Sequence, residues 1–379
     1  MKPTQITFAA AIMLAACAAH AQSSATLYGL IDEGLDFTSN AVGHRAWQMV
    51  SGNTAGSRFG IKGSEDLGDG MQAVFQLENA FDLNSGSLEG GRMFGRQAWV
   101  GLASNRWGRL TFGRQYDPSI DLWSDFTATG SMIGDLAAHP YNNDNADYSW
   151  HINNSVKYVT PTIAGLTGEV MYGFGNQAGS FADNRMIGAG ASYVYGPISA
   201  SFVYTRMDSP GSTSGGALGG DQVFTADAQQ NIDAGVKYTF ANHASVGLAW
   251  SHTNVYAPTA NAFVTNIGTA AWDSWKFDNF EINGQYYLTP ALSLTGEYTF
   301  THATMRGSEG QSSPSWQQVA LMLNYSVSPR TSVYLQGAYQ HAQNGHTGSA
   351  FDYANIVYSA DVSSSPNQAM ARVGILHTF

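Results

Sequence analysis

The feature that most constrains the fold of this chain is a repeated alternation of apolar and polar side chains. In residues 26–37, Leu27 and Ile31 share one parity, while Asp32 and Asp36 lie on the other. Such alternation is typical of a β-strand with one apolar face and one wet face. The pattern recurs in segments 58–62, 72–78, 92–103, 107–115, 155–158, 169–174, 186–195, 198–208, 228–240, 245–256, 272–288, 292–304, 315–327, 331–343 and 368–379. It therefore predicts an all-β chain of sixteen strands.

The connections between these segments alternate between a few residues and many. Ser64–Gly70 and Asn242–His243 are predicted as short turns, whereas Ser209–Asp227 and Asn344–Pro366 are long connections. This is the pattern of an up-and-down membrane barrel with tight turns at one end and longer loops at the other. Strands of about ten residues cross a bilayer when they are tilted by about 45°. Because a soluble β-sandwich would be expected to use shorter strands, we expect an antiparallel transmembrane β-barrel.

The amino terminus has the pattern of an export signal. Lys2 precedes an apolar run, Phe8–Ala19, which ends in the small-x-small cleavage site Ala19-His20-Ala21. The run is too short to span a bilayer as a helix. Residues 1–21 are therefore predicted to be a cleaved signal peptide, and residues 22–379 to form a single barrel domain.

Cys17 is the only cysteine in the sequence and allows a rival cleavage. Leu14-Ala15-Ala16-Cys17 also resembles the site at which bacterial lipoproteins are cut and acylated. The strand pattern begins by Ala25 and leaves little tether after Cys17, so this cut is the less favoured one. After cleavage at Ala21 the chain has no cysteine, which excludes disulfides, a thiol nucleophile and thiolate metal sites. We expect neither a metal nor another cofactor.

Composition narrows the class of partner. Without Lys2 the chain has 28 acidic and 16 basic side chains, a formal charge of −12. An acidic chain with no basic cluster is not expected to bind nucleic acid. The 42 glycines and the 12% aromatic content fit a β-rich chain with many turns. The mature chain has no candidate transmembrane helix, so in a membrane it must form a closed barrel.

The longest interruption of the strand pattern is Tyr116–Trp150. It contains no lysine or arginine and has six carboxylates: Asp117, Asp121, Asp125, Asp135, Asp144 and Asp147. Long segments without regular structure are uncommon in compact domains and are often functional. We interpret the segment as a loop that folds into the mouth of the barrel and narrows a water-filled channel. A solvated acidic surface loop is the alternative.

Seven motifs occur in order along nearly the whole mature chain. They are Thr26-Leu27-Tyr28-Gly29, Gly56-Ser57-Arg58-Phe59-Gly60, Gly63-Ser64-Glu65-Asp66-Leu67-Gly68-Asp69-Gly70, Arg96-Gln97-Ala98-Trp99-Val100-Gly101-Leu102, Leu110-Thr111-Phe112-Gly113-Arg114-Gln115, Asn154-Ser155-Val156-Lys157-Tyr158-Val159-Thr160-Pro161 and Arg372-Val373-Gly374-Ile375-Leu376-His377-Thr378-Phe379. In their order and spacing together, these motifs resemble the Gram-negative general porin family, and most closely its β-proteobacterial branch.

The resemblance implies a sixteen-stranded barrel, usually a trimer, whose third external loop folds inward and faces basic residues on the wall. That loop would be residues 116–150. Arg58 and Arg96 match positions where the family carries wall arginines, and both lie on the predicted lumen parity. His151 stands where relatives often have another arginine, and it is mostly uncharged near neutral pH. Lys157 shares the parity of His151 and is expected to replace part of its charge.

The predicted pore constriction combines these basic residues with the loop carboxylates Asp117, Asp121, Asp125 and Asp135. Opposite charges across a narrow lumen create a field that favours charged or dipolar solutes over apolar ones. Because acids outnumber bases, a mild cation preference is expected. Counting alternate residues along its strand places Arg114 on the face toward lipid. It is therefore assigned to anchoring the loop and not to the pore. Phe379 resembles the terminal signal that the barrel-assembly machinery reads.

The function implied is passive diffusion of ions and small hydrophilic solutes across the outer membrane, in contact with its lipid. Two rivals remain at this point. A barrel hydrolase would need a Ser–His pair brought together by barrel closure, but the histidines are scattered and none shows metal-ligand spacing. An adhesin or a substrate-specific channel would need fixed recognition loops, whereas Ser209–Asp227 and Asn344–Pro366 are rich in Gly and Ser. We therefore expect a channel and not an enzyme.

Overall fold

The computed structural model describes residues 24–264 and 266–379. The predicted signal peptide, residues 1–21, lies outside the described residues, and so does Cys17. All sixteen predicted strands lie within the described residues.

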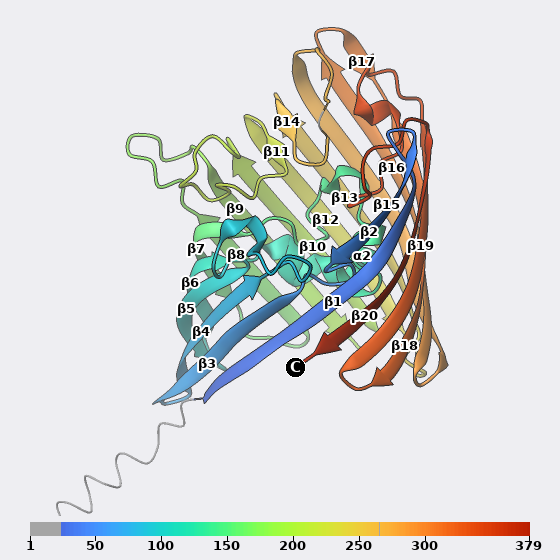
Figure 1. The fold of residues 1–379 in the computed structure, drawn as a ribbon. Coiled ribbons are helices and arrows are strands. Elements are labelled where there is room, and N and C mark those ends of the chain that lie inside the picture. The colour runs from blue at the N-terminus through green and yellow to red at the C-terminus, as the bar shows by residue number, and fades with distance from the viewer. Residues whose placement is uncertain (1–23, 265) are drawn as a thin grey trace, which may run out of the picture.

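The chain forms one closed antiparallel β-barrel (Figure 1). Its sheet has 18 strands, of which β2 and β17 are short additions to β1 and β16, so sixteen strands form the wall and the predicted number is confirmed. These are β1 (Ser24–Ala41), β3 (Arg58–Gly68), β4 (Met71–Ala80), β5 (Gln97–Ser104), β6 (Gly108–Gln115), β7 (Ile152–Val159), β8 (Leu166–Gly173), β9 (Arg185–Tyr195), β10 (Ile198–Asp208), β12 (Ala228–Thr239), β13 (Ser245–Tyr256), β15 (Trp272–Thr289), β16 (Leu292–Gly307), β18 (Ser315–Ser328), β19 (Thr331–Gln343) and β20 (Asn367–Thr378). Pairing of β20 with β1, from Leu30 with Thr378 to Thr38 with Met370, closes the barrel.

The alternation read from the sequence separates an inner from an outer face. On β16, Thr295, Glu297 and Thr299 are buried, whereas Leu294 and Tyr298 are exposed. Every second side chain thus faces the interior and the others face outward, where a bilayer would contact them. This outward row of large apolar side chains is what a membrane barrel requires.

Several element boundaries differ from the predictions. β3 continues to Gly68 and β4 begins at Met71, so the predicted turn Ser64–Gly70 contains only Asp69 and Gly70 between strands. The acidic and glycine residues suggested a longer turn, but hydrogen bonding with β1 and β4 keeps most of them in the strand. β5 begins at Gln97, which leaves residues 92–96 in the preceding loop.

The short strands were not predicted. β2 (His44–Ser51) folds back on β1, where Phe37 pairs with Trp47, and β17 (Gly310–Ser312) extends β16. A separate two-stranded sheet joins β11 (Phe224–Thr225) to β14 (Ala260–Asn261). β11, β14 and β17 have only two or three residues, over which alternation is not a usable signal. β2 has eight residues and was missed in the connection between β1 and β3.

Residues 116–151 connect β6 to β7 and are called loop 116–151. The loop contains the short helices η2 (Ser119–Trp123), η3 (Ser124–Phe126), α2 (Ala128–Ser131), η4 (Asp135–Ala137) and η5 (Pro140–Asn142). Figure 1 shows it, with α2, surrounded by strands. Its apolar side chains pack on inward-facing residues of the wall; for example, Ile133 and Leu136 pack with Ala320 of β18. Among the described helices, none is long and apolar enough to cross a membrane.

The inward parity is not polar throughout, so on some strands it differs from the wet face that the alternation predicted. Trp275 and Phe277 of β15 and Trp316 of β18 are fully buried on that parity. They form an apolar cluster with Tyr141 of loop 116–151 and Phe351 from the long connection before β20. These inward-facing aromatic side chains contact apolar side chains of the loops and not lumen water. One side of the barrel interior is therefore filled by packed loops.

Candidate functional site

Inside the barrel lies a cavity of about 730 Å³, called the lumen cavity. It lies between the wall and loop 116–151. Its charged lining residues are Arg58, Arg92, Arg96, Arg114, Arg372, Glu78, Asp82, Glu89, Asp135, Asp147 and Asp221, with His151 beside them. Four of the predicted constriction residues therefore line one cavity: Arg58, Arg96, His151 and Asp135.

The two wall arginines differ in their partners. Arg96, just before β5, donates from Nε to Glu78 Oε1 at 3.0 Å and from Nη2 to the Tyr116 hydroxyl at 2.7 Å. Within residues 24–264 and 266–379, the Arg58 side chain has no hydrogen-bonding or ion-pair partner. Arg96 is thus a paired charge that also holds the start of loop 116–151, whereas the charge of Arg58 is uncompensated.

Loop 116–151 contributes two carboxylates to the lumen cavity. Asp147 accepts hydrogen bonds from the Ser149 backbone N–H and hydroxyl and from the Tyr358 hydroxyl, each at 3.1 Å. Burial raises the pKa of Asp147 to about 6. Burial, reinforced by the charge of Asp147, also raises the pKa of Asp135 well above its usual value. Asp147 therefore loses its negative charge between neutral and mildly acidic pH.

His151 lies at the end of the loop and does not act as a third wall cation. Its ring packs against Tyr116, with ring centroids 4.8 Å apart, and its Nδ1 lies 3.5 Å from Asp221 Oδ2. Burial lowers the pKa of His151 to about 4. The imidazole is therefore uncharged at neutral pH.

These pKa values predict how ion preference depends on pH. Lowering the pH from 7 to 5 should shift selectivity toward anions, because Asp147, with its pKa of about 6, becomes protonated while the arginines keep their charge. His151, with a pKa of about 4, stays neutral over this range. The measurement is the reversal potential under a salt gradient at both pH values. His151→Asn should keep the shift and Asp147→Asn should reduce it; the reverse result would contradict the assignment.

Lys157 is placed away from the lumen cavity. It is buried between the wall and the loop, where Nζ donates to the Tyr116 carbonyl at 3.0 Å and forms an ion pair with Asp121. Glu169 Oε1 lies 3.8 Å from the same nitrogen. The expectation that Lys157 replaces part of the charge at His151 does not fit this position, because its charge is used in joining the loop to the wall.

Asp117 and Asp125 are also not brought to the cavity. Asp117 is buried and accepts hydrogen bonds from the Ser119 N–H and from Asn145 Nδ2, both at 2.7 Å, so it stabilises the fold of the loop. Asp125 lies beside Lys237, which donates to its backbone carbonyl. The loop carboxylates at the cavity are Asp135, which was predicted, and Asp147, which nothing in the sequence distinguished from the other acids of the loop.

Arg114 does not lie where parity counting put it. It lines the lumen cavity and donates to the Gly95 carbonyl at 2.6 Å and to Asn153 Oδ1 at 2.5 Å, and it pairs with Asp221. The pairing of β6 with β7 changes register between Gly113 and Gln115. Such an irregularity changes the direction in which a side chain points. Counting alternate residues along β6 therefore assigns Arg114 to the wrong face of the barrel. Besides reaching the end of loop 116–151, Arg114 holds a different loop through Asp221.

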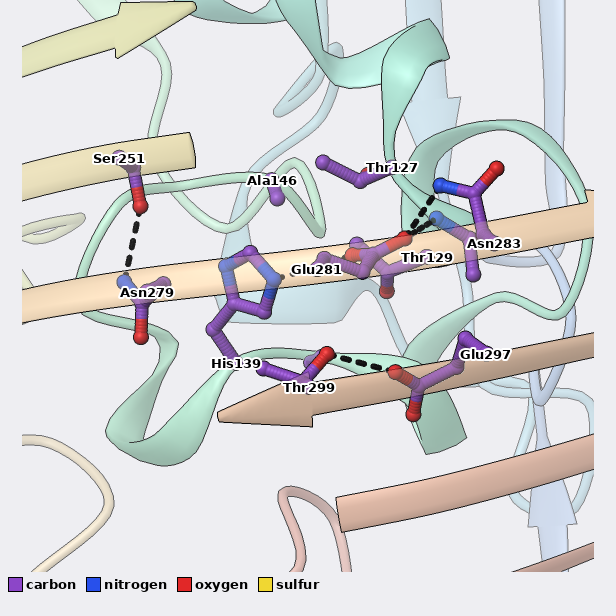
Figure 2. Close-up of polar contacts among 12 residues, drawn as sticks. Thr127, Thr129, His139, Ala146, Ser251, Asn279, Glu281, Asn283, Glu297 and Thr299 are labelled. Atoms are coloured by element: carbon purple, nitrogen blue, oxygen red, sulfur yellow. Dashed lines mark hydrogen bonds and ion pairs between the residues drawn. The ribbon is translucent and has the colours of Figure 1, made fainter. Parts of the chain in front are cut away.

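The loop is attached to the opposite wall by a buried polar network that includes His139 (Figure 2). His139 is fully buried; its Nδ1 lies 2.6 Å from Asp144 Oδ2 and its Nε2 lies 3.0 Å from Glu281 Oε2 on β15. Glu281 also accepts from the Ala128 N–H at 2.7 Å. Figure 2 shows the imidazole beside the carboxylate of Glu281. Burial alone would lower the pKa of His139, but Asp144 and Glu281 raise it well above its usual value.

Nothing in the sequence distinguishes His139 from the other scattered histidines. Its carboxylate partners are 5 and 142 residues away, so spacing alone does not identify the network. In the described part of the chain, no group of three or more acidic, histidine or cysteine side chains is placed to hold a metal ion.

Comparisons with known proteins place this geometry in context. A family model described as Gram-negative porin matches residues 9–345. An outer membrane porin protein of Bordetella pertussis is 30% identical over 371 residues, covering 88% of this chain and 93% of the relative. Outer membrane porin protein 32 of Delftia acidovorans is 28% identical and covers 98% of both chains.

Solved structures show the same fold. The anion-selective porin from Comamonas acidovorans superposes with a TM-score of 0.71 at 22% identity, over 94% of this chain and all of the other. The trimer form of OmpT from Vibrio cholerae gives a TM-score of 0.64 at 17% identity, over 94% of this chain and 99% of the other. At these sequence identities, the structural similarity shows that the fold is shared. It does not show that the charged residues of the lumen are shared.

Proposed function

The chain belongs to the Gram-negative porin family and is a passive diffusion channel of the outer membrane, not an enzyme, and we propose that the lumen cavity is its constriction. In this proposal loop 116–151 is the segment that narrows the channel. Arg58 and Arg96 supply the basic side of the constriction, and Asp135 and Asp147 supply the acidic side.

One observation carries the proposal: basic residues of the wall and carboxylates of loop 116–151 line the same cavity. Charges of opposite sign on facing walls create a transverse field in a confined aqueous space. A solute with separated charges can align with this field and exchange part of its hydration for contacts with both walls. The class of solute that fits best is therefore a small zwitterion, with its carboxylate toward Arg58 and its ammonium group toward the loop acids.

The test is permeation through the refolded chain in lipid vesicles. Discrete conductance steps in a planar bilayer would first establish an open channel. Vesicle swelling should then be faster with a small zwitterionic amino acid than with an uncharged polyol of similar size. Equal swelling rates from conducting channels would contradict a role for the field, and the absence of conductance from a folded barrel would contradict the constriction itself.

Ion selectivity near neutral pH is proposed to be weak. Of the cavity arginines, Arg96 pairs with Glu78, and Arg372 of β20 pairs with Asp36 at 2.9 Å. These pairs remove much of the positive charge that a row of arginines would otherwise present. In this respect the chain would differ from the anion-selective porin of Comamonas acidovorans, whose fold it shares.

The proposed assembly is a homotrimer in the outer membrane. The trimer form of OmpT, a structural neighbour, supports this proposal. The exposed apolar outer face, including Leu248 and Ile282, suits contact with lipid or with other subunits. Phe379 pairs with Gly29 through both backbone groups, at 3.0 and 3.2 Å, and remains the proposed signal for the barrel-assembly machinery.

A further inference from the structure

Asp221 reaches the lumen cavity from a loop that is remote in sequence from the other lining residues. It lies in residues 209–227, which connect β10 to β12. Its Oδ1 is 2.8 Å from Arg92 Nη1, and its Oδ2 pairs with Arg114 Nη2. The same Oδ2 accepts from the His151 backbone N–H at 3.3 Å. One carboxylate thus binds two guanidinium groups and the end of loop 116–151.

This double pairing makes Asp221 different from the other acids of the cavity. Glu78 neutralises one arginine, Arg96. The cavity arginine Arg372 is likewise paired with a single acid, Asp36, which does not line the cavity. Asp221 is the shared partner of two arginines, and all three side chains line the lumen cavity. Without the carboxylate, two cations would face the solute path with no counter-charge. Because interaction strength rises in a confined low-dielectric space, a single charge here has a large effect on permeating ions.

The position of Asp221 is held by contacts that do not involve its carboxylate. Leu218, three residues earlier, is fully buried in the apolar cluster. The Ala217 carbonyl accepts from the Asn153 N–H of β7 at 2.8 Å, and the Ala217 N–H donates to the Asn184 carbonyl at 2.8 Å. The loop therefore has its own packing and backbone attachment to the barrel. Replacing the carboxylate by an amide of the same shape should change charge more than structure.

We propose that Asp221 is a selectivity-determining residue of the channel, which keeps ion preference weak by neutralising Arg92 and Arg114 from a separate loop. The inference rests on the proposal that the lumen cavity is the constriction. Burial would raise the pKa of Asp221, but hydrogen bonding to His151 and the charge of Arg114 lower it. The carboxylate is therefore ionised at neutral pH, as this role requires.

The experiment compares wild type with Asp221→Asn and Asp273→Asn in planar bilayers under a potassium chloride gradient. Asp273 is an exposed acid at the start of β15 that does not line the cavity, so Asp273→Asn makes the same charge change elsewhere. Asp221→Asn should raise the chloride-to-potassium permeability ratio at least about threefold. Asp273→Asn should leave the ratio unchanged. A wild-type ratio in folded, conducting Asp221→Asn channels would overturn the inference.

A double variant separates charge from structure. Arg92→Gln combined with Asp221→Asn removes one charge of each sign, so the ratio should return toward the wild-type value. A purely structural role for Asp221 would not be rescued in this way, and absence of rescue would overturn the electrostatic role. If Asp221→Asn fails to fold, Arg92→Gln alone should shift the ratio toward potassium, and an unchanged ratio would count against the inference.

The outcome also distinguishes this inference from the proposed constriction. If Arg58→Ser changes the permeability ratio and Asp221→Asn does not, the constriction stands and the role of Asp221 falls. If neither variant changes the ratio of a conducting channel, the lumen cavity is not the selectivity-determining part of the pore.

Discussion

Replacing Arg58 by serine should shift the ion preference toward cations several-fold while leaving the barrel as stable as wild type. The side chain lines the lumen cavity and has no ion-pair or hydrogen-bonding partner in the described chain. Its removal takes away one positive charge and leaves no buried acid without a partner. Charges at the narrowest part of a pore dominate selectivity, so the permeability ratio should change by about threefold or more.

Arg96→Ser is the informative comparison, because the same charge is removed from a paired side chain. Glu78 is 4% exposed and would lose its ion-pair partner at 3.0 Å, keeping the hydrogen bond from the Tyr28 hydroxyl, and the Tyr116 hydroxyl would lose its donor at 2.7 Å. Breaking a buried pair by removing one partner costs about 3–5 kcal/mol. Arg96→Ser should therefore change selectivity and also lower the unfolding temperature, whereas Arg58→Ser should change selectivity alone.

The measurement is the reversal potential of single channels under a salt gradient, with thermal unfolding followed on the same samples. Arg106→Ser is the matched control, because Arg106 is exposed in the turn between β5 and β6 and does not line the cavity. An Arg58→Ser channel with the wild-type permeability ratio would show that this guanidinium does not act on permeating ions.

The barrel was predictable from sequence because its signal is repeated. Alternation in each strand fixes which side chains face outward, and β16 follows it from Ser293 to Met305. The apolar side of the interior was not predictable, since Trp275 and Phe277 lie on the inward parity but pack against loop residues. Strand periodicity reports which face a residue is on. It does not report whether that face meets water or another part of the chain.

The candidate site was predictable only where position depends on a strand or its immediate end. Arg58, the first residue of β3, and Arg96, just before β5, were predicted from their match to wall arginines of the porin family and from strand parity. Arg114 was misplaced because a change of register between β6 and β7 breaks the counting of parity. Asp221 carried no local signal, because its role depends on contacts with residues more than 60 positions away in the sequence. Contacts of this kind between loops follow from the closed barrel and are not encoded in spacing.

Replacing His139 by alanine should have the largest effect on how loop 116–151 is held. The imidazole is fully buried between Asp144 and Glu281. Its loss would leave two buried carboxylates without the cation that joins them, at a cost of about 3–5 kcal/mol. The loop would then leave the wall more easily, so the channel should show larger and noisier conductance and faster proteolysis within residues 116–151. His346→Ala, at an exposed loop position, is the control.

The pH dependence of this attachment tests the same network in the wild type. The pKa of His139 is raised in the folded chain. Protonated His139 therefore stabilises the fold fully at pH values below its pKa in the unfolded chain, near 6.5. This stabilisation is lost as the pH rises through the raised pKa of the folded chain. His139 lowers the pKa of Asp144 in the folded chain. Ionised Asp144 therefore stabilises the fold at pH values above its pKa in the unfolded chain, near 3.9, and this stabilisation is lost as the pH falls through the lowered pKa of the folded chain. Channel noise should therefore be lowest between these limits and should rise at alkaline pH in wild type. His139→Ala should be noisy throughout, and quiet, wild-type-like channels from this variant would show that the loop is held by its apolar packing alone.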